Sequence, residues 1–119
     1  MRAPFHESGA ARLKVELDSG NGRTRTIDGV LDTGASLCHI PQVVASQMGL
    51  AQKGWFSVGS TQRESKEPGY YVRLVIPGMF EDTVAMKPDY DFVLVGRSVL
   101  KALKFVFDGP RREFELGRE

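Results

Sequence analysis

The sequence contains a single cysteine, Cys38, among 119 residues, so no disulfide can form within the chain. No apolar run approaches the roughly 20 residues that a membrane-spanning helix needs. Residues 1–13 have no apolar stretch of the kind found in signal peptides. These absences favour a reducing compartment. We therefore expect a cytoplasmic location, unless the chain is excised from a longer membrane-attached or secreted protein.

An excess of charge is also missing. The 16 Lys and Arg residues balance 15 Asp and Glu residues, which gives a net charge of +1 without any basic block. Such a surface is a poor match for nucleic acid or an anionic membrane. The histidines, His6 and His39, have no metal-ligand spacing with the one cysteine, and no Gly-rich phosphate loop is present. We expect neither a metal nor another cofactor.

The sequence contains many short segments whose residue pattern is typical of β-strands. Residues 1–10 have no periodicity and are predicted to be a flexible arm, ordered only where something holds it. Residues 11–119 are predicted to form one domain. Leu13, Val15 and Leu17 alternate with charged residues, which is typical of a half-buried strand, and Asn21-Gly22 suits a hairpin turn.

The later segments are also short and strand-like, with frequent Gly and Pro between them. Strands are predicted over residues 23–31, 37–40, 53–60, 64–76, 81–87, 91–95, 105–107 and 111–116. Short helices are predicted over residues 42–48 and 98–103, and Pro68-Gly69 indicates a break or bulge. Many short strands with two short helices indicate an all-β barrel or sandwich.

Asp32 is the central candidate for chemistry. It follows the apolar pair Val30-Leu31 and opens a turn of small residues, Thr33 to Ser36, which presents a carboxylate rather than burying it. The alternative interpretation is an ordinary Asx turn between two strands, which this tripeptide also forms in unrelated proteins.

A second motif lies near the C-terminus. The apolar strand Phe92 to Val95 ends in Gly96-Arg97, and a short apolar helix is predicted to follow. The Asp32 turn and this motif, in this order and at this distance, resemble the retropepsin-like aspartic peptidases in their single-domain homodimeric form. The resemblance covers residues 13–116 in outline. It implies a closed acid-protease-type β-barrel with one or two short helices.

The resemblance also implies roles for individual residues. Asp32 would be catalytic, within an active-site loop supported by Thr33, Gly34, Ala35 and Ser36. Thr33 would hydrogen-bond across a dimer, Gly34 would leave room for substrate and donate its N–H to the carboxylate, and Ser36 would support the loop through its side chain. Because one aspartate cannot both activate water and protonate the leaving nitrogen, two copies of Asp32 would meet at a homodimer interface.

Two features depart from the retroviral members of this family. An acidic residue that often follows Asp-Thr-Gly-Ala is replaced by Ser36, so Arg97 of the Gly96-Arg97 structural motif needs another acceptor. A backbone carbonyl and the side chain of Asp108 are the alternatives. The segment 56–67, which would be the substrate-binding flap, is also poorer in glycine and more polar than retroviral flaps.

Within that segment, the flap residues are predicted to be Val58, Gly59, Ser60 and Thr61. The alternative is a solvated hairpin without a role in binding. The neighbours Cys38 and His39 do not favour a thiol protease, because adjacent residues of a strand point to opposite faces, and Cys38 is better explained as a small buried group.

The sequence thus supports two hypotheses. The first is a homodimeric aspartic endopeptidase that needs no cofactor and acts on extended peptides or proteins. The second is a retropepsin-fold module that binds peptides or dimerises with little or no hydrolysis. A two-domain pepsin-like enzyme is excluded within this chain, because only one aspartate loop is present.

Overall fold

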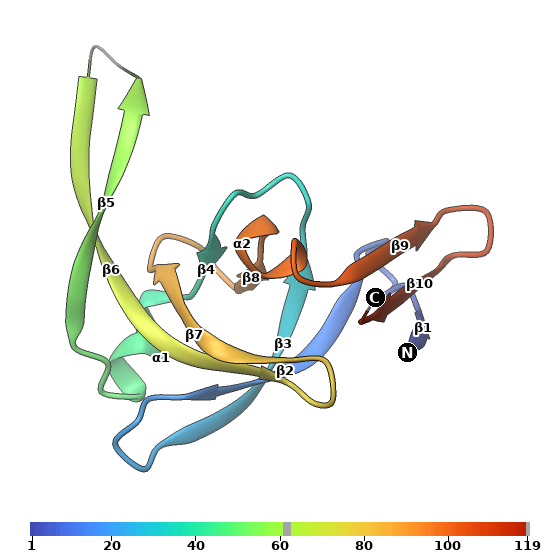
Figure 1. The fold of residues 1–119 in the computed structure, drawn as a ribbon, viewed down its shortest axis with the longest axis horizontal. Helices are drawn as coiled ribbons and strands as arrows, with labels where there is room; N and C mark the ends of the chain where they lie inside the picture. Colours follow the sequence, from blue (N-terminus) through green and yellow to red (C-terminus); the bar gives the residue numbers. More distant parts are fainter. Residues whose placement is uncertain (61–62, 119) are drawn as a thin grey trace.

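The body of the molecule is a closed β-barrel (Figure 1). The computed structural model describes residues 1–60 and 63–118. In that part of the chain the barrel strands are β2 (Arg12–Asp18), β3 (Thr24–Leu31), β4 (Cys38–His39), β6 (Arg63–Ile76), β7 (Phe80–Lys87) and β8 (Val93–Val95). They pair in the order β2-β3-β8-β4-β7-β6, and β6 pairs again with β2, which closes the barrel. The predicted closed barrel is therefore confirmed.

The two predicted helices are present and short. Helix α1 (Gln42–Gln47) follows Pro41, which suits a helix start because proline has no N–H to leave unpaired. Helix α2 (Arg97–Leu100) is shorter than the predicted span 98–103, and a turn completes the connection to the next strand.

The hairpin that delivers the chain to Asp32 forms where the alternating pattern predicts it. Strands β2 and β3 pair with Val15 opposite Ile27, and Gly20 and Gly22 take positive φ angles of 83° and 87° in the turn. The side chains of Val15 and Leu17 are buried. Register is therefore set by the hydrophobic face as well as by the turn.

Strand β8 is the buried strand at the centre of the site. It runs parallel to β3, with Leu31 opposite Val95, and all three of its residues are buried. Gly29 of β3 lies so close that a Cβ atom there would come within 3.3 Å of the Val95 side chain. Around this strand the core is formed by large side chains that are at most 1% exposed, among them Leu17, Ile40, Leu74, Ile76, Met86, Phe114 and Leu116.

A separate three-stranded sheet joins the two ends of the chain. Its order is β1 (Arg2–Pro4), β10 (Glu113–Gly117) and β9 (Lys104–Asp108), and it projects from the barrel in Figure 1. Residues 2–4 of the predicted flexible arm, residues 1–10, thus form a strand. The element that holds this part of the arm is β10.

Strand β5 (Gln52–Ser60) pairs with β6 to make a long hairpin that extends away from the barrel (Figure 1). The register shifts between Gln52 and Gly54, opposite Gly69 and Tyr70. The irregularity expected at Pro68-Gly69 is thus a bulge, whose extra residue lies on β5. In the described part of the chain, neither helix is long and apolar enough to cross a membrane.

Candidate active site

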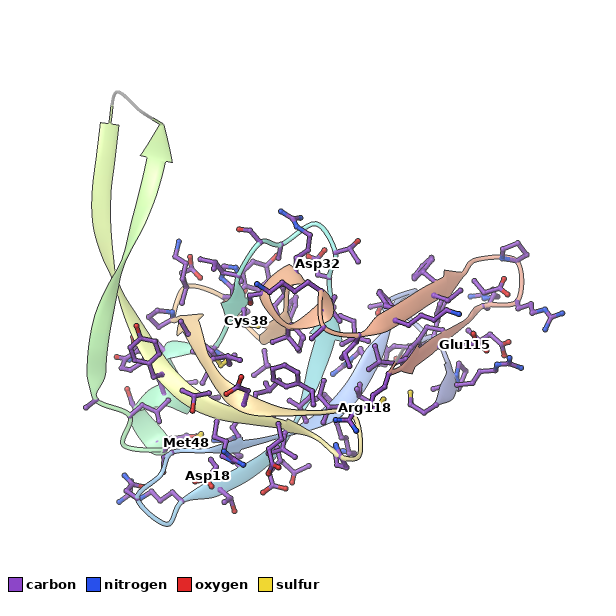
Figure 2. The ribbon with its side chains drawn as sticks, in the orientation of Figure 1. Asp18, Asp32, Cys38, Met48, Glu115 and Arg118 are labelled. Carbon is purple, nitrogen blue, oxygen red and sulfur yellow. The ribbon has the colours of Figure 1, made fainter. Side chains whose placement is uncertain are left out.

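Asp32 directly follows the last residue of β3, Leu31, where the chain leaves the barrel (Figure 2). Its backbone N–H donates to the carbonyl of Val95 at 3.0 Å, so the ladder between β3 and β8 continues to this residue. The side chain is partly exposed, between the buried Leu31 and the exposed Thr33. The barrel therefore ends in a carboxylate that reaches solvent.

Small residues allow the turn after Asp32 to close on its own carboxylate. The N–H of Gly34 donates to Oδ1 of Asp32 at 2.7 Å, and the N–H of Ala35 donates to the Asp32 carbonyl at 3.3 Å. A Cβ atom on Gly34 would come within 3.0 Å of that Oδ1. The turn has the geometry of the Asx turn considered from the sequence, and this geometry orients the carboxylate.

The turn is attached to the start of α2 by two backbone hydrogen bonds. Arg97 N–H donates to the Ala35 carbonyl at 2.8 Å, and Ser98 N–H donates to the Ser36 carbonyl at 3.1 Å. Gly96 makes this approach possible, since a Cβ atom there would lie 2.2 Å from the carbonyl oxygen of Leu37. Its φ of −94° and ψ of −171° suit any residue, so the requirement for glycine comes from space alone.

The guanidinium of Arg97 adds a third attachment. Its Nη1 donates to the carbonyl of Thr33 at 2.6 Å. The acceptor of Arg97 is therefore a backbone carbonyl, one of the two alternatives considered from the sequence. Asp108, the other candidate acceptor, instead accepts a hydrogen bond from the N–H of Arg111 at 3.1 Å. The two sequence motifs are therefore brought into direct contact, although 64 residues separate Thr33 from Arg97.

Each loop residue has a defined contact. Ala35 and Ser36 act through their carbonyl groups, whereas the sequence had suggested the Ser36 side chain. Thr33 and Ser36 are exposed residues.

Cys38 has no exposed area, and its Sγ lies 3.5 Å from Oγ of Ser98. The prediction of a buried structural cysteine is confirmed. Within the residues that the structure describes, no three His, Cys, Asp or Glu side chains gather as a possible metal site.

A charged cluster formed by β4 and the end of β7 could not be recognised from the sequence. His39 Nδ1 lies 2.5 Å from Oδ1 of Asp89, and Nζ of Lys87 lies 3.3 Å from Oδ2. The His39 ring also contacts Tyr90, with the centroids 5.4 Å apart, and Tyr90 meets Phe92 edge to face at 4.9 Å. His39 and Asp89 are 50 residues apart in the sequence, so no local pattern indicates their pairing.

This cluster lowers the pKa of Asp89. Partial burial raises it, but the hydrogen bonds and positive charges of His39 and Lys87 together outweigh burial and leave the pKa below its usual value. A carboxyl whose pKa is lower in the folded state contributes stability above its unfolded pKa of about 3.9, and the contribution is lost as the pH falls further.

Asp89→Asn should therefore destabilise the protein at neutral pH, and the difference from wild type should shrink as the pH falls from about 5 to 2. Thermal unfolding of both proteins across this range measures the effect. Asp91→Asn, an exposed change in the same loop, is the control. A gap in melting temperature that stays constant with pH would contradict the assigned charge interaction.

A hollow of about 270 Å³ lies next to the Asp32 loop. It is lined by Thr33, Arg97, Leu100, Lys101, Leu103 and Phe105. The lining combines the exposed side of the loop, helix α2 and the first part of β9. The hollow therefore connects the candidate active site with the terminal sheet.

The flap prediction falls on the hairpin of β5 and β6. Val58, Gly59 and Ser60 lie at the end of β5, where Val58 pairs with Ser65 and Gly59 with Glu64. Thr61 lies outside the described residues. The hairpin thus exists at the predicted place, and its role in binding stays a prediction.

Comparison with solved structures identifies the fold. The chain is similar to a retropepsin-like aspartic protease from Rickettsia conorii, with a TM-score of 0.67 and 21% identity over 98% of this chain and 88% of that chain. The simian foamy virus (mac) protease gives a TM-score of 0.53 at 17% identity, over 76% of this chain and 92% of that chain. The EIAV protease, complexed with the inhibitor HBY-793, gives 0.57 at 12%, over 83% and 92%.

No protein-family model matches the chain, and no curated protein sequence matches it at a significant level. The structural likeness is therefore carried by the arrangement of strands and not by overall sequence. This protein has a retropepsin-like fold, and the predicted acid-protease type of the barrel is confirmed. Its structural neighbours are aspartic proteases.

Proposed function

We propose that this protein is an aspartic endopeptidase whose active site forms when two identical chains bring their Asp32 carboxylates together. The observation that supports the proposal is the construction of the loop. A partly exposed carboxylate accepts a hydrogen bond from Gly34 N–H, and three hydrogen bonds from Arg97 and Ser98 attach the loop to α2. These contacts hold the loop and its carboxylate in one orientation, as a catalytic group requires.

The chemistry needs the second copy. Two carboxylates a few ångströms apart cannot both ionise easily, so they share one proton, which is the established behaviour of aspartic-protease dyads. The ionised Asp32 accepts a proton from water while the water oxygen attacks the scissile carbonyl carbon. The protonated Asp32 hydrogen-bonds the carbonyl oxygen. Breakdown of the tetrahedral intermediate transfers a proton to the leaving nitrogen and breaks the C–N bond.

The substrate class follows from the same arrangement. An extended peptide can bind as an added strand, with main-chain hydrogen bonds supplying affinity and side-chain pockets supplying preference. Thr33, an exposed residue, would hydrogen-bond to the loop of the partner subunit. No metal or other cofactor enters this mechanism.

The proposal is tested by titrating the protein with a statine-type peptide, which mimics the tetrahedral intermediate. We expect one inhibitor to bind per two chains in calorimetry, and sedimentation of the complex should give twice the 13.2 kDa chain mass. The same preparation should cleave a mixture of unstructured peptides, with the products identified by mass spectrometry. Stoichiometric binding without any cleavage would favour the alternative of a peptide-binding module.

The β5–β6 hairpin is proposed to be the flap that closes over the bound peptide. Inhibitor binding should then slow amide exchange at Val58, Gly59 and Ser60, because closure protects hydrogen bonds at the end of the hairpin. Gly59→Val should lower kcat/KM several-fold, since a branched residue stiffens the strand. The turn at Gly20 to Gly22 is the internal control, and equal protection there would contradict a specific closure.

A further inference from the structure

The turn between β1 and β2 contacts the barrel through a histidine side chain. The backbone N–H of His6 donates to the Ala10 carbonyl at 2.9 Å, and the N–H of Gly9 donates to the His6 carbonyl at 2.8 Å. Gly9 takes a positive φ of 88°, which suits glycine. Residues 6–10 therefore form a closed turn within the predicted flexible arm. The His6 ring reaches from this turn to Arg12, the first residue of β2.

Both ring nitrogens of His6 face groups that donate hydrogen bonds. Nε2 lies 3.0 Å from Nη1 of Arg12, a guanidinium nitrogen that can only donate. Nδ1 lies 3.1 Å from the backbone nitrogen of Ser8, which also can only donate, and 2.9 Å from Oγ of Ser8, which can donate or accept. A doubly protonated ring could accept from none of them. The arrangement therefore fits the neutral ring and opposes the charged one.

The contact with Arg12 selects one tautomer of the neutral ring. Only the ring nitrogen without a proton can accept, and a hydrogen bond from a charged donor is about twice as strong as one from a neutral donor. Nε2 therefore accepts from Arg12, and the proton lies on Nδ1, which donates to Oγ of Ser8. The ring thus connects the turn with β2.

The guanidinium of Arg12 remains a cation beside this ring. Its Nε is buried and has no hydrogen-bond partner among the described residues, and its Nη2 donates to Oδ2 of Asp28 on β3 at 3.2 Å. Lys14 lies 3.5 Å from the other oxygen of that carboxylate, so Asp28 is shared between two cations. Protonation of His6 would therefore set a second positive charge 3.0 Å from Arg12.

The other charged groups around the turn do not replace this contact. The charged residues of the surrounding elements are Glu7 of the turn, Arg12 and Lys14 of β2, Asp28 of β3, and Arg112 and Glu113 at the start of β10. Of these, Arg12 is the one that contacts the ring. The charge of His6 is therefore opposed most directly by the charge of Arg12.

The turn lies between two anchors that do not involve the imidazole. Before it, the N–H of Phe5 donates to the Arg112 carbonyl at 2.9 Å. After it, the Ala11 carbonyl accepts a hydrogen bond from the N–H of Leu31 at 2.9 Å. Loss of the histidine contact should therefore free the turn and leave the strands on either side in place.

We propose that residues 6–10 form a pH-sensitive strap, which is held on β2 while His6 is neutral and released when His6 gains a proton. Protonation removes the acceptor at Nε2 and leaves an N–H of the ring facing an N–H of Arg12. Histidine changes its charge between about pH 5 and 8. Docking of the strap therefore contributes stability on the alkaline side of this range, and the contribution is lost as the pH falls.

Amide hydrogen exchange measures the release. The protection factors of the N–H groups of His6 and Gly9 correct for the pH dependence of intrinsic exchange, and they should fall at least about tenfold from about pH 7.5 to about pH 5. The N–H of Leu31, which donates to Ala11, is the internal control and should change much less. Equal protection of His6 and Gly9 at the two pH values would overturn the strap.

Variants assign the release to one histidine. His6→Gln cannot gain a proton, and its Oε1 can accept from Arg12, so protection in the turn should be nearly the same at both pH values. His39→Gln, the same change at the other histidine of the chain, is the matched control and should keep the fall in protection. A fall that persists in His6→Gln, or that disappears in His39→Gln, would overturn the assignment.

The tautomer of His6 gives a readout that a merely structural turn would not show. Nitrogen NMR spectra of the imidazole at about pH 7.5 should show the proton on Nδ1 and none on Nε2. In Arg12→Met, Nδ1 is free to accept from Ser8 N–H, so the proton should move to Nε2 and the pH effect should shrink. A wild-type ring with its proton on Nε2 would overturn the proposed contact. None of these measurements uses peptide cleavage, so their outcome does not depend on the proposed peptidase activity.

Discussion

Asp32→Asn should remove peptide hydrolysis while leaving the protein folded. The amide cannot accept the proton of the attacking water, and loss of a positioned base typically costs about 10²–10⁴-fold in rate. The fold should persist because Asp32 is partly exposed and the asparagine oxygen can still accept the hydrogen bond from Gly34 N–H. The measurements are kcat/KM on a peptide that the wild type cleaves, and the melting temperature of each variant.

Asp82→Asn, on an exposed part of β7, is the matched control and should retain full activity. A clean preparation of Asp32→Asn that keeps more than a few per cent of the activity would remove Asp32 from the catalytic role.

Mixing wild type with Asp32→Asn tests whether the active site needs two chains. With equal amounts of the two proteins and random pairing, about one quarter of the dimers carry two Asp32 residues. Activity per wild-type chain should therefore fall by about half.

Gly96→Ala should strongly destabilise the protein. The new methyl group would lie 2.2 Å from the Leu37 carbonyl oxygen and 2.8 Å from the Ala35 carbonyl oxygen, and neither can move without breaking the loop. Overpacking against backbone in this way should cost about 3 kcal/mol or more in the free energy of unfolding. The melting temperature should fall by on the order of 10 °C.

Gly117→Ala is the matched control, because no atom lies within 4 Å of its added Cβ. It should change the free energy of unfolding by less than about 0.5 kcal/mol. At a temperature where Gly96→Ala remains folded, its activity should still be well below that of wild type, since the displaced Ala35 carbonyl belongs to the loop that carries Asp32. A Gly96→Ala protein as stable and active as wild type would mean that the loop does not pack on Gly96.

The contact between Arg97 and the Asp32 loop also shows which group serves as the acceptor for Arg97 when position 36 is a serine. The Arg97 guanidinium takes the Thr33 carbonyl as its acceptor. Its charge therefore supports the loop that carries Asp32 within one chain.

Local patterns in the sequence determined most of the elements. Alternation predicts β2, Asn21-Gly22 predicts its hairpin turn, and the apolar run ending at Val95 predicts the buried strand beside Asp32. These predictions succeed because side-chain periodicity, turn chemistry and strand burial depend on neighbours in the sequence. The two motifs that resemble retropepsin-like peptidases likewise lie in continuous stretches.

Only the tertiary structure decided what depends on distant residues. Three contacts join segments that are far apart in the sequence: β1 with β10, Arg97 with the Thr33 carbonyl, and His39 with Asp89. The closeness of Gly96 to Leu37 follows from the packing of α2 on the loop. Hydrogen-bond partners and excluded space are set by the closure of the barrel. No periodicity in the sequence encodes them, because each depends on which surfaces meet once the chain has folded.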